Sequence, residues 1–214
     1  MRIHPTRVHL FPLFLLFLIF AGNAAFAANS DHYLYHIKDK SAYASFGFPD
    51  ASGCIWTSIN LFAAERAGHA SDLDQFSEAY IYVSLNTEDR CDGWRTLSSS
   101  SGEQVLEPRM LGFTGNLGGA AVVADVVLYD RASGTPHTVG LDLTWTGIGE
   151  SWSGRQSETY RQAAYRYTYR FVGSSRDAEA TGTVLLDGAA FSSGTASYAS
   201  LYNSRNGYME VTLN

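Results

Sequence analysis

The alternation of apolar and polar residues with a period of two constrains the fold more than any other feature of this chain. It runs through residues 55–62, 79–85 and 139–145. A period of two is the repeat of a β-strand, because successive side chains point to opposite faces of a sheet. Further stretches with strand character are 120–129, 165–171, 178–186 and 209–213.

Local turn signals divide these runs. The segment Ala132–Pro136 predicts a hairpin loop, and Asn206-Gly207 is a strong hairpin signal because both residues tolerate positive φ. Gly173–Ser175 and Asp187-Gly188 predict further turns. Each turn is expected to end one strand and begin the next.

Two less regular stretches predict loops. Residues 63–77 contain a weak helical pattern with a glycine inside it and no clear cap, so we expect a loop there. The serine-rich segment Ser98–Gln104 predicts a surface loop, or a linker between two halves. Seven to ten strands at this spacing predict an all-β, antiparallel β-sandwich. A β-barrel or two small β half-domains are the alternatives.

Residues 1–27 have the order of a secretory signal peptide. A positively charged start is followed by a short apolar stretch and by the small-residue pattern Ala25-Phe26-Ala27. The apolar stretch is interrupted by Pro12 and is shorter than the roughly 20 residues that a membrane span needs. The sequence therefore predicts a single secreted domain at 28–214, extracellular or periplasmic and not embedded in a membrane.

Cys54 and Cys91 are the only cysteines. In an exported chain two cysteines are most simply one disulfide, whereas a metal site would need histidine or carboxylate ligands at zinc spacing. No such spacing is present. We therefore expect a Cys54–Cys91 bridge.

The charge balance excludes several classes of partner. The chain has 15 basic and 21 acidic residues, and loss of the leader with two of the basic residues would give a net charge of −8 (13 − 21). An acidic chain repels phosphate backbones, so nucleic acid is not an expected partner. No glycine-rich phosphate loop follows a predicted strand, which argues against nucleotide chemistry.

Three short segments resemble an uncharacterised family of secreted bacterial β-rich proteins. They are Gly53-Cys54 with the strand that follows it, Leu141–Gly147 and Arg176–Gly182. The resemblance implies a secreted β-rich domain. It implies no activity, because none is assigned to that family.

Asp125 and Asp142 are the best candidates for paired catalytic carboxylates. The predicted hairpin would place Asp125 opposite Thr144 and Asp142 opposite Val127, with both acids on one face as diagonal neighbours. Such a pair, or one that includes Glu150, would suit a glycan-directed hydrolase. The alternative is an ordinary solvated face, and the sequence does not show that the protein is an enzyme.

Two groups of residues are weak candidates for metal ligands. Glu88, Asp89 and Asp92 lie close together beside Cys91 and are weak candidates for calcium, although they do not match the spacing of a known calcium loop. His32 and His36 are four residues apart but lack the glutamate of a zinc-protease helix. No cofactor is therefore expected, with calcium as the alternative.

Aromatic residues are the stronger candidates for ligand contacts. Tyr165, Tyr167 and Tyr169 should share one face of a strand, and Trp94 and Trp152 are expected in loops. Exposed aromatic rings can bind sugar rings, whereas tyrosines on strands more often fill space beside the core. These five residues are the predicted ligand-binding set.

The leading interpretation is a secreted extracellular binding or surface-interaction domain without evident catalysis, with a carbohydrate or cell-envelope ligand. A secreted hydrolase with paired carboxylates is one alternative. A structural or inhibitor-like module that contacts other proteins through a strand edge is another.

Overall fold

The computed structural model describes residues 32–70, 73–161 and 165–212, so the predicted leader at 1–27 lies outside the described residues. The described chain forms ten β-strands and no helix. The strands are β1 His32–Pro49, β2 Ile55–Ala70, β3 Leu73–Asp89, β4 Arg95–Val105, β5 Leu111–Thr114, β6 Gly119–Asp130, β7 Pro136–Arg161, β8 Tyr165–Leu186, β9 Ala189–Thr195 and β10 Tyr198–Thr212. Within these residues there is consequently no helix that could cross a membrane.

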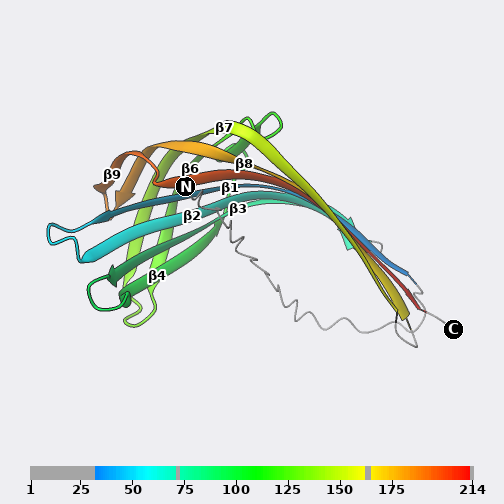
Figure 1. Cartoon of the computed structure of the whole chain (residues 1–214), viewed down its shortest axis with the longest axis horizontal. Helices are drawn as coiled ribbons and strands as arrows, with labels where there is room; N and C mark the ends of the chain where they lie inside the picture. The colour runs from blue at the N-terminus through cyan, green and yellow to red at the C-terminus, as the bar shows by residue number, and fades with distance from the viewer. Residues whose placement is uncertain (1–31, 71–72, 162–164, 213–214) are drawn as a thin grey trace, which may run out of the picture. The chain divides into compact units, whose positions relative to one another are not determined.

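All ten strands belong to one antiparallel sheet, so the predicted all-β, antiparallel class is confirmed. The order of neighbours is β10-β1-β2-β3-β4-β6-β7-β8-β9, and β5 pairs with β6. Strand β10 pairs with β8 as well as with β1, so this path of hydrogen-bonded neighbours returns on itself (Figure 1).

The core lies on the inner side of this curled sheet. It is built from apolar residues of seven long strands, β1, β2, β3, β6, β7, β8 and β10, among them Ala42, Ile59, Val83, Val126 and Leu143. Strands β7 and β1 lie on opposite sides of this core. A hydrogen bond joins them across it, in which the Trp145 indole N–H donates to the Tyr43 carbonyl oxygen at 2.9 Å. Period-two alternation thus places one set of side chains in a common core and the other set on the outer face.

The predicted disulfide is confirmed. Cys54 and Cys91 are bonded, with their Cα atoms 5.2 Å apart. The bridge joins the segment before β2 to the turn that follows β3. It therefore fastens the open ends of two neighbouring strands.

Six strands continue past the core as a sheet that we call the extension. In order of pairing it contains β3, β2, β1, β10, β8 and β7, through residues 73–79, 65–70, 35–40, 203–212, 165–176 and 151–161. Figure 1 shows these strands running on side by side beyond the part of the sheet that encloses the core. The extension carries the candidate site.

The length of these strands corrects four predictions of turns or loops. Gly173–Ser175 lies inside β8, Asn206-Gly207 inside β10, Ser98–Gln104 inside β4, and residues 63–70 and 73–77 inside β2 and β3. Each of these segments is held extended by hydrogen bonds to the adjoining strands. This pairing outweighs the local preference for a turn. The turns after Asp130 and at Asp187-Gly188 are confirmed.

Candidate functional site

Eight basic residues share one face of the extension, which we call the basic face. It continues the core-lining face of the sheet, and all of the eight except Arg176 are exposed. They are Lys38, Lys40, Arg155, Arg161, Arg166, Arg170, Arg176 and Arg205. Among the residues of the extension whose side chains are described, Glu65 is the one acid at a position on this face.

Strand register brings several of these positive charges together. Lys38 lies directly opposite Arg205, and Arg161 directly opposite Arg166. Like charges placed opposite each other on paired strands repel and destabilise the sheet. The one acid offsets a single cation, because Glu65 lies 3.7 Å from the Lys40 ammonium nitrogen. Arg176 donates hydrogen bonds to the Gly149 and Leu117 carbonyl oxygens, and the other six cations are available to an anion.

An open cleft lies at the base of the basic face. Its volume is about 690 Å³, and it separates strands β1, β2, β3 and β10 from the segment that joins β4 to β5. Lys38 and Arg205 line one side, and Val105, Pro108 and Arg109 line the other. Three acids, Glu65, Glu78 and Glu107, also line the cleft, which therefore combines apolar surface with charges of both signs, the basic residues being more numerous.

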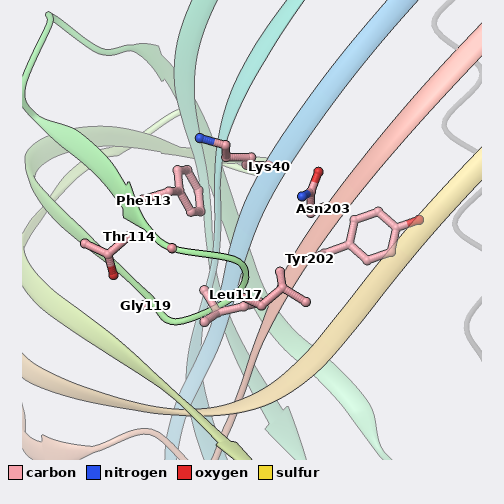
Figure 2. A pocket seen from close by; sticks show the side chains of 9 residues that line it. Lys40, Phe113, Thr114, Leu117, Gly119, Tyr202 and Asn203 are labelled. Atoms are coloured by element: carbon pink, nitrogen blue, oxygen red, sulfur yellow. The ribbon is translucent and has the colours of Figure 1, made fainter. Parts of the chain in front are cut away.

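A second hollow, of only about 10 Å³, adjoins the cleft and shares Lys40 and Asn203 with it. The Lys40 ammonium nitrogen lies 5.9 Å from the centroid of the Phe113 ring. Figure 2 shows Lys40 beside Phe113, whereas Tyr202 points away from both. Lys40 is thus held by the ring and by Glu65, which leaves Lys38 and Arg205 as the more available cations.

The opposite face of the extension carries a row of tyrosines. Tyr160, Tyr167, Tyr208 and Tyr35 come from β7, β8, β10 and β1 in turn, and their ring centroids are 4.7, 5.5 and 5.2 Å apart along the row. These separations match the spacing of neighbouring strands. The rings therefore cover much of one another's faces and present mainly edges and hydroxyl groups.

This row sets the environment of the predicted tyrosine site. Tyr167 belongs to the row, and the Tyr169 hydroxyl donates a 2.9 Å hydrogen bond to the Asn206 side-chain oxygen. Burial raises the pKa of the Tyr169 hydroxyl. The side chain of Tyr165 lies outside the described residues.

Trp94 lies in the turn beside the disulfide, as predicted, and forms the outer layer of a stack. The Arg90 guanidinium carbon is 3.7 Å from the centroid of Trp56 and 4.4 Å from that of Trp94. The Trp94 side chain is still 59% exposed. One ring face therefore rests on a cation while much of the ring meets solvent.

Trp152 was expected in a loop, and the structure places it within β7. Its ring lies over Gly154, because a Cβ at that glycine would stand only 2.6 Å from the far end of the indole. Trp152 is 55% exposed on the outer face of the sheet. The β7–β8 register shifts between Gly147 and Ser151, just before this tryptophan.

The register of Asp125 and Asp142 also differs from the prediction. Asp125 pairs with Gly140 and Asp142 with Val123, because the hairpin turn is centred closer to β6 than expected. Both acids nevertheless lie on the outer face and remain diagonal neighbours. They lie on the opposite side of the sheet from the core.

Of the three predicted calcium candidates, Glu88 lies within β3, and Asp89 and Asp92 engage in local contacts. The Asp89 carboxylate accepts hydrogen bonds from the backbone N–H groups of Cys91 and Asp92, and Arg95 approaches the carboxylates of both acids at 3.9 and 3.1 Å. Across the described part of the chain, no three histidine, cysteine or acidic residues are grouped as a metal site would require. His36 instead lies 5.3 Å from His69 across two strands, ring to ring.

Sequence reasoning detected only part of the basic face. The alternation of Arg166 and Arg170 with tyrosines was evident, but predicted turns interrupted β8 and β10 before their other cations could be aligned. The missing signal is that the cations of the extension in β1, β7, β8 and β10 occupy either only even-numbered or only odd-numbered positions of each strand. They therefore share one face of the sheet. Recognising this pattern requires the strand order, which sequence does not supply.

Comparison with known proteins found no matching family model, no matching curated protein and no matching solved structure. The resemblance to a family of secreted β-rich proteins therefore stays a prediction. The function has to be argued from the site itself.

Proposed function

We propose that this protein is a secreted binding domain that holds an anionic polymer of the cell envelope or extracellular surface on its basic face. The observation that carries the proposal is the segregation of eight cations onto one face against a single acid. A chain with a net charge of −6 would not gather these cations on one face by composition alone. The proposal involves no catalysis.

Two further features support this assignment. The leader pattern at 1–27 and the Cys54–Cys91 bridge both suit an exported protein. The cations are distributed over four adjoining strands, β1, β10, β8 and β7, and guanidinium groups form paired hydrogen bonds with phosphate, sulfate and carboxylate groups. An extended ligand with repeated negative charges fits such a face better than a small molecule does.

The test is binding of dextran sulfate compared with neutral dextran, measured by isothermal titration calorimetry across a range of salt concentrations. We expect binding of the sulfated polymer only, with an affinity that falls steeply as salt rises. Arg170→Glu should weaken binding at least tenfold, because it reverses a charge at the centre of the basic face.

Arg131→Glu is the matched control. Arg131 is exposed in the turn between β6 and β7, away from the extension, and its reversal changes the net charge by the same amount. Affinity of this variant should stay within about twofold of the wild type. Equal losses in both variants, or equal binding of neutral dextran, would refute the proposal.

Trp94 supports a second candidate function, which is stacking of a neutral sugar ring. The ring is exposed on one side, is backed by Arg90 and Trp56, and stands beside a disulfide that fixes the turn. Trp94 also has a φ of 65°, an unfavourable conformation for a residue with a side chain. Such strain is often found at binding sites.

A neutral glycan panel read by tryptophan fluorescence tests this second function. Trp94→Ala should lower the affinity for a bound glycan at least tenfold. Trp152→Ala is the comparison, because that tryptophan is similarly exposed but lies over Gly154 in β7, outside the turn that the disulfide fixes. Glycan binding that survives Trp94→Ala, or that Trp152→Ala weakens equally, would count against a stacking site at Trp94.

A further inference from the structure

The cleft at the base of the extension has apolar surface that plays no part in the binding of an anionic polymer. Val105 is 72% exposed at the end of β4 and lines the cleft together with Pro108 and the exposed Glu107. Leu106 and Leu111, beneath them, are buried in the core. This wall of the cleft therefore presents apolar surface that is fixed to the core but remains in contact with solvent.

Three cations from separate elements line the cleft. Lys38 of β1 and Arg205 of β10 lie opposite each other in register, and Arg109 reaches the cleft from the other wall. None of the three forms an ion pair with a described acid, whereas Lys40 is paired with Glu65. An anionic group placed among them would relieve the repulsion between Lys38 and Arg205.

The backbone at Arg109 is strained. Its φ is 83°, in the left-handed region that residues with side chains rarely adopt. The Met110 N–H donates to the Glu107 carbonyl at 3.1 Å, and the Val123 N–H donates to the Met110 carbonyl at 2.9 Å, so the turn is tied to β6. A glycine would adopt this conformation without cost, and the presence of arginine there suggests that its side chain is required.

We propose that the cleft binds an amphiphilic anion, namely a single phosphate or carboxylate headgroup attached to an apolar chain. The headgroup lies among Lys38, Arg205 and Arg109, and the chain lies along Val105 and Pro108. The volume of about 690 Å³ is within the range of small-molecule sites. The inference rests on the proposed function only in that Lys38 and Arg205 belong to both sites.

Dodecyl phosphate is the probe, with dodecanol and inorganic phosphate as its two halves, and binding is measured by calorimetry on the full secreted domain. We expect dodecyl phosphate to bind at least tenfold more tightly than either half. Absence of dodecyl phosphate binding would overturn the inference. Equally tight binding of inorganic phosphate would overturn the role of the apolar wall.

Two variants locate the site. Val105→Asp places a charge on the apolar wall, and Arg109→Gly removes a cation while relieving the strained backbone. Each should weaken dodecyl phosphate binding at least tenfold, and Arg109→Gly should keep or raise the Tm, which shows that the loss is not unfolding. Val123→Asp, at an exposed valine on the outer face of β6, is the control and should leave binding unchanged.

The same proteins separate this inference from the proposed function. Val105→Asp should keep dextran sulfate binding, and Arg170→Glu should keep dodecyl phosphate binding. Polymer binding without dodecyl phosphate binding would overturn the cleft alone, and the reverse result would overturn the polymer proposal alone. Dodecyl phosphate binding that resists both cleft variants would also refute this site.

Discussion

At the scale of single residues, Asp187 holds the turn between β8 and β9 against the start of β7. One carboxylate oxygen accepts a 2.8 Å hydrogen bond from the Thr138 backbone N–H, and the other lies 2.9 Å from the His137 ring nitrogen Nδ1. These hydrogen bonds, with that of His137 first, hold the pKa of the Asp187 carboxyl below its ordinary value. The φ of 51° at Asp187 is one that aspartate and asparagine tolerate.

The lowered pKa predicts how stability depends on pH. A carboxyl whose pKa is lower in the folded state contributes stability above its unfolded pKa of about 3.9, and this contribution is lost as pH falls through the folded pKa. Asp187→Asn keeps the backbone conformation and removes the charge. We expect the variant to have a lower Tm than the wild type between pH 5 and 7.

Thermal unfolding followed by circular dichroism from pH 7 to pH 3 measures this difference. The gap in Tm should narrow as pH falls below about 4, because the unfolded carboxyl takes up a proton there whereas the folded carboxyl does so only at its lower pKa. A gap that stays constant down to pH 3 would show that the charge of Asp187 does not stabilise the turn.

At the scale of strands, β4 and β6 meet over a short and close contact. Their register contains only the pairs Ser100 with Asp130 and Ser101 with Tyr129. Gly102 follows directly, and a Cβ there would overlap the Val127 carbonyl oxygen. The absence of a side chain at Gly102 is therefore what lets the two strands approach.

Gly102→Ala should destabilise the protein by about 1–3 kcal/mol, because the new methyl group forces β4 away from β6. Gly112→Ala is the control, since a Cβ at Gly112 would meet no atom within 4 Å. That variant should change the free energy of unfolding by no more than about 0.5 kcal/mol. Urea unfolding measures both, and equal stability of the two variants would contradict the close contact at Gly102.

The disulfide closes a segment with a sequence separation of 37 residues. On the loop-entropy model its removal should cost about 4 kcal/mol. The Cys54→Ala/Cys91→Ala double variant tests this by urea unfolding, with no reductant needed. A loss below about 1 kcal/mol would mean that the β2–β3 pairing alone fixes these strand ends.

The strands also show where prediction from sequence succeeds and where it fails. Alternation at 55–62 and 139–145 was sufficient to place those residues in strands. Every second side chain there faces the core and is apolar, and this pattern is visible in the sequence. Asn206-Gly207 failed as a turn signal because β10 is paired on both sides, with Gly207 opposite His36 and Arg170. Turn preference is local, whereas that pairing joins segments far apart in the chain.

The same limit applied to the candidate site. The Cys54–Cys91 bridge followed from cysteine number and the expected compartment, so it needed no knowledge of strand order. The basic face needed the order β7-β8-β10-β1, which places Arg155, Arg205 and Lys38 on one surface. Composition alone indicated an acidic chain and concealed this segregation.

At the scale of the whole described domain, one indole links the two walls of the curled sheet. Trp145 is 1% exposed, and its N–H donates to the Tyr43 carbonyl across the core. Phenylalanine at this position would lose that hydrogen bond and leave a cavity beside β1. Trp145 therefore adds a contact across the core to the strand pairing that holds the sheet together.

Trp145→Phe should lower the free energy of unfolding by about 1–3 kcal/mol, which combines the lost hydrogen bond with the lost packing. Trp152→Phe, at an exposed tryptophan on the same strand, should change it by less than about 0.5 kcal/mol. Urea unfolding of both variants measures the difference. Equal stability of the two variants would mean that β1 and β7 are held together through their neighbouring strands alone, without the contact across the core.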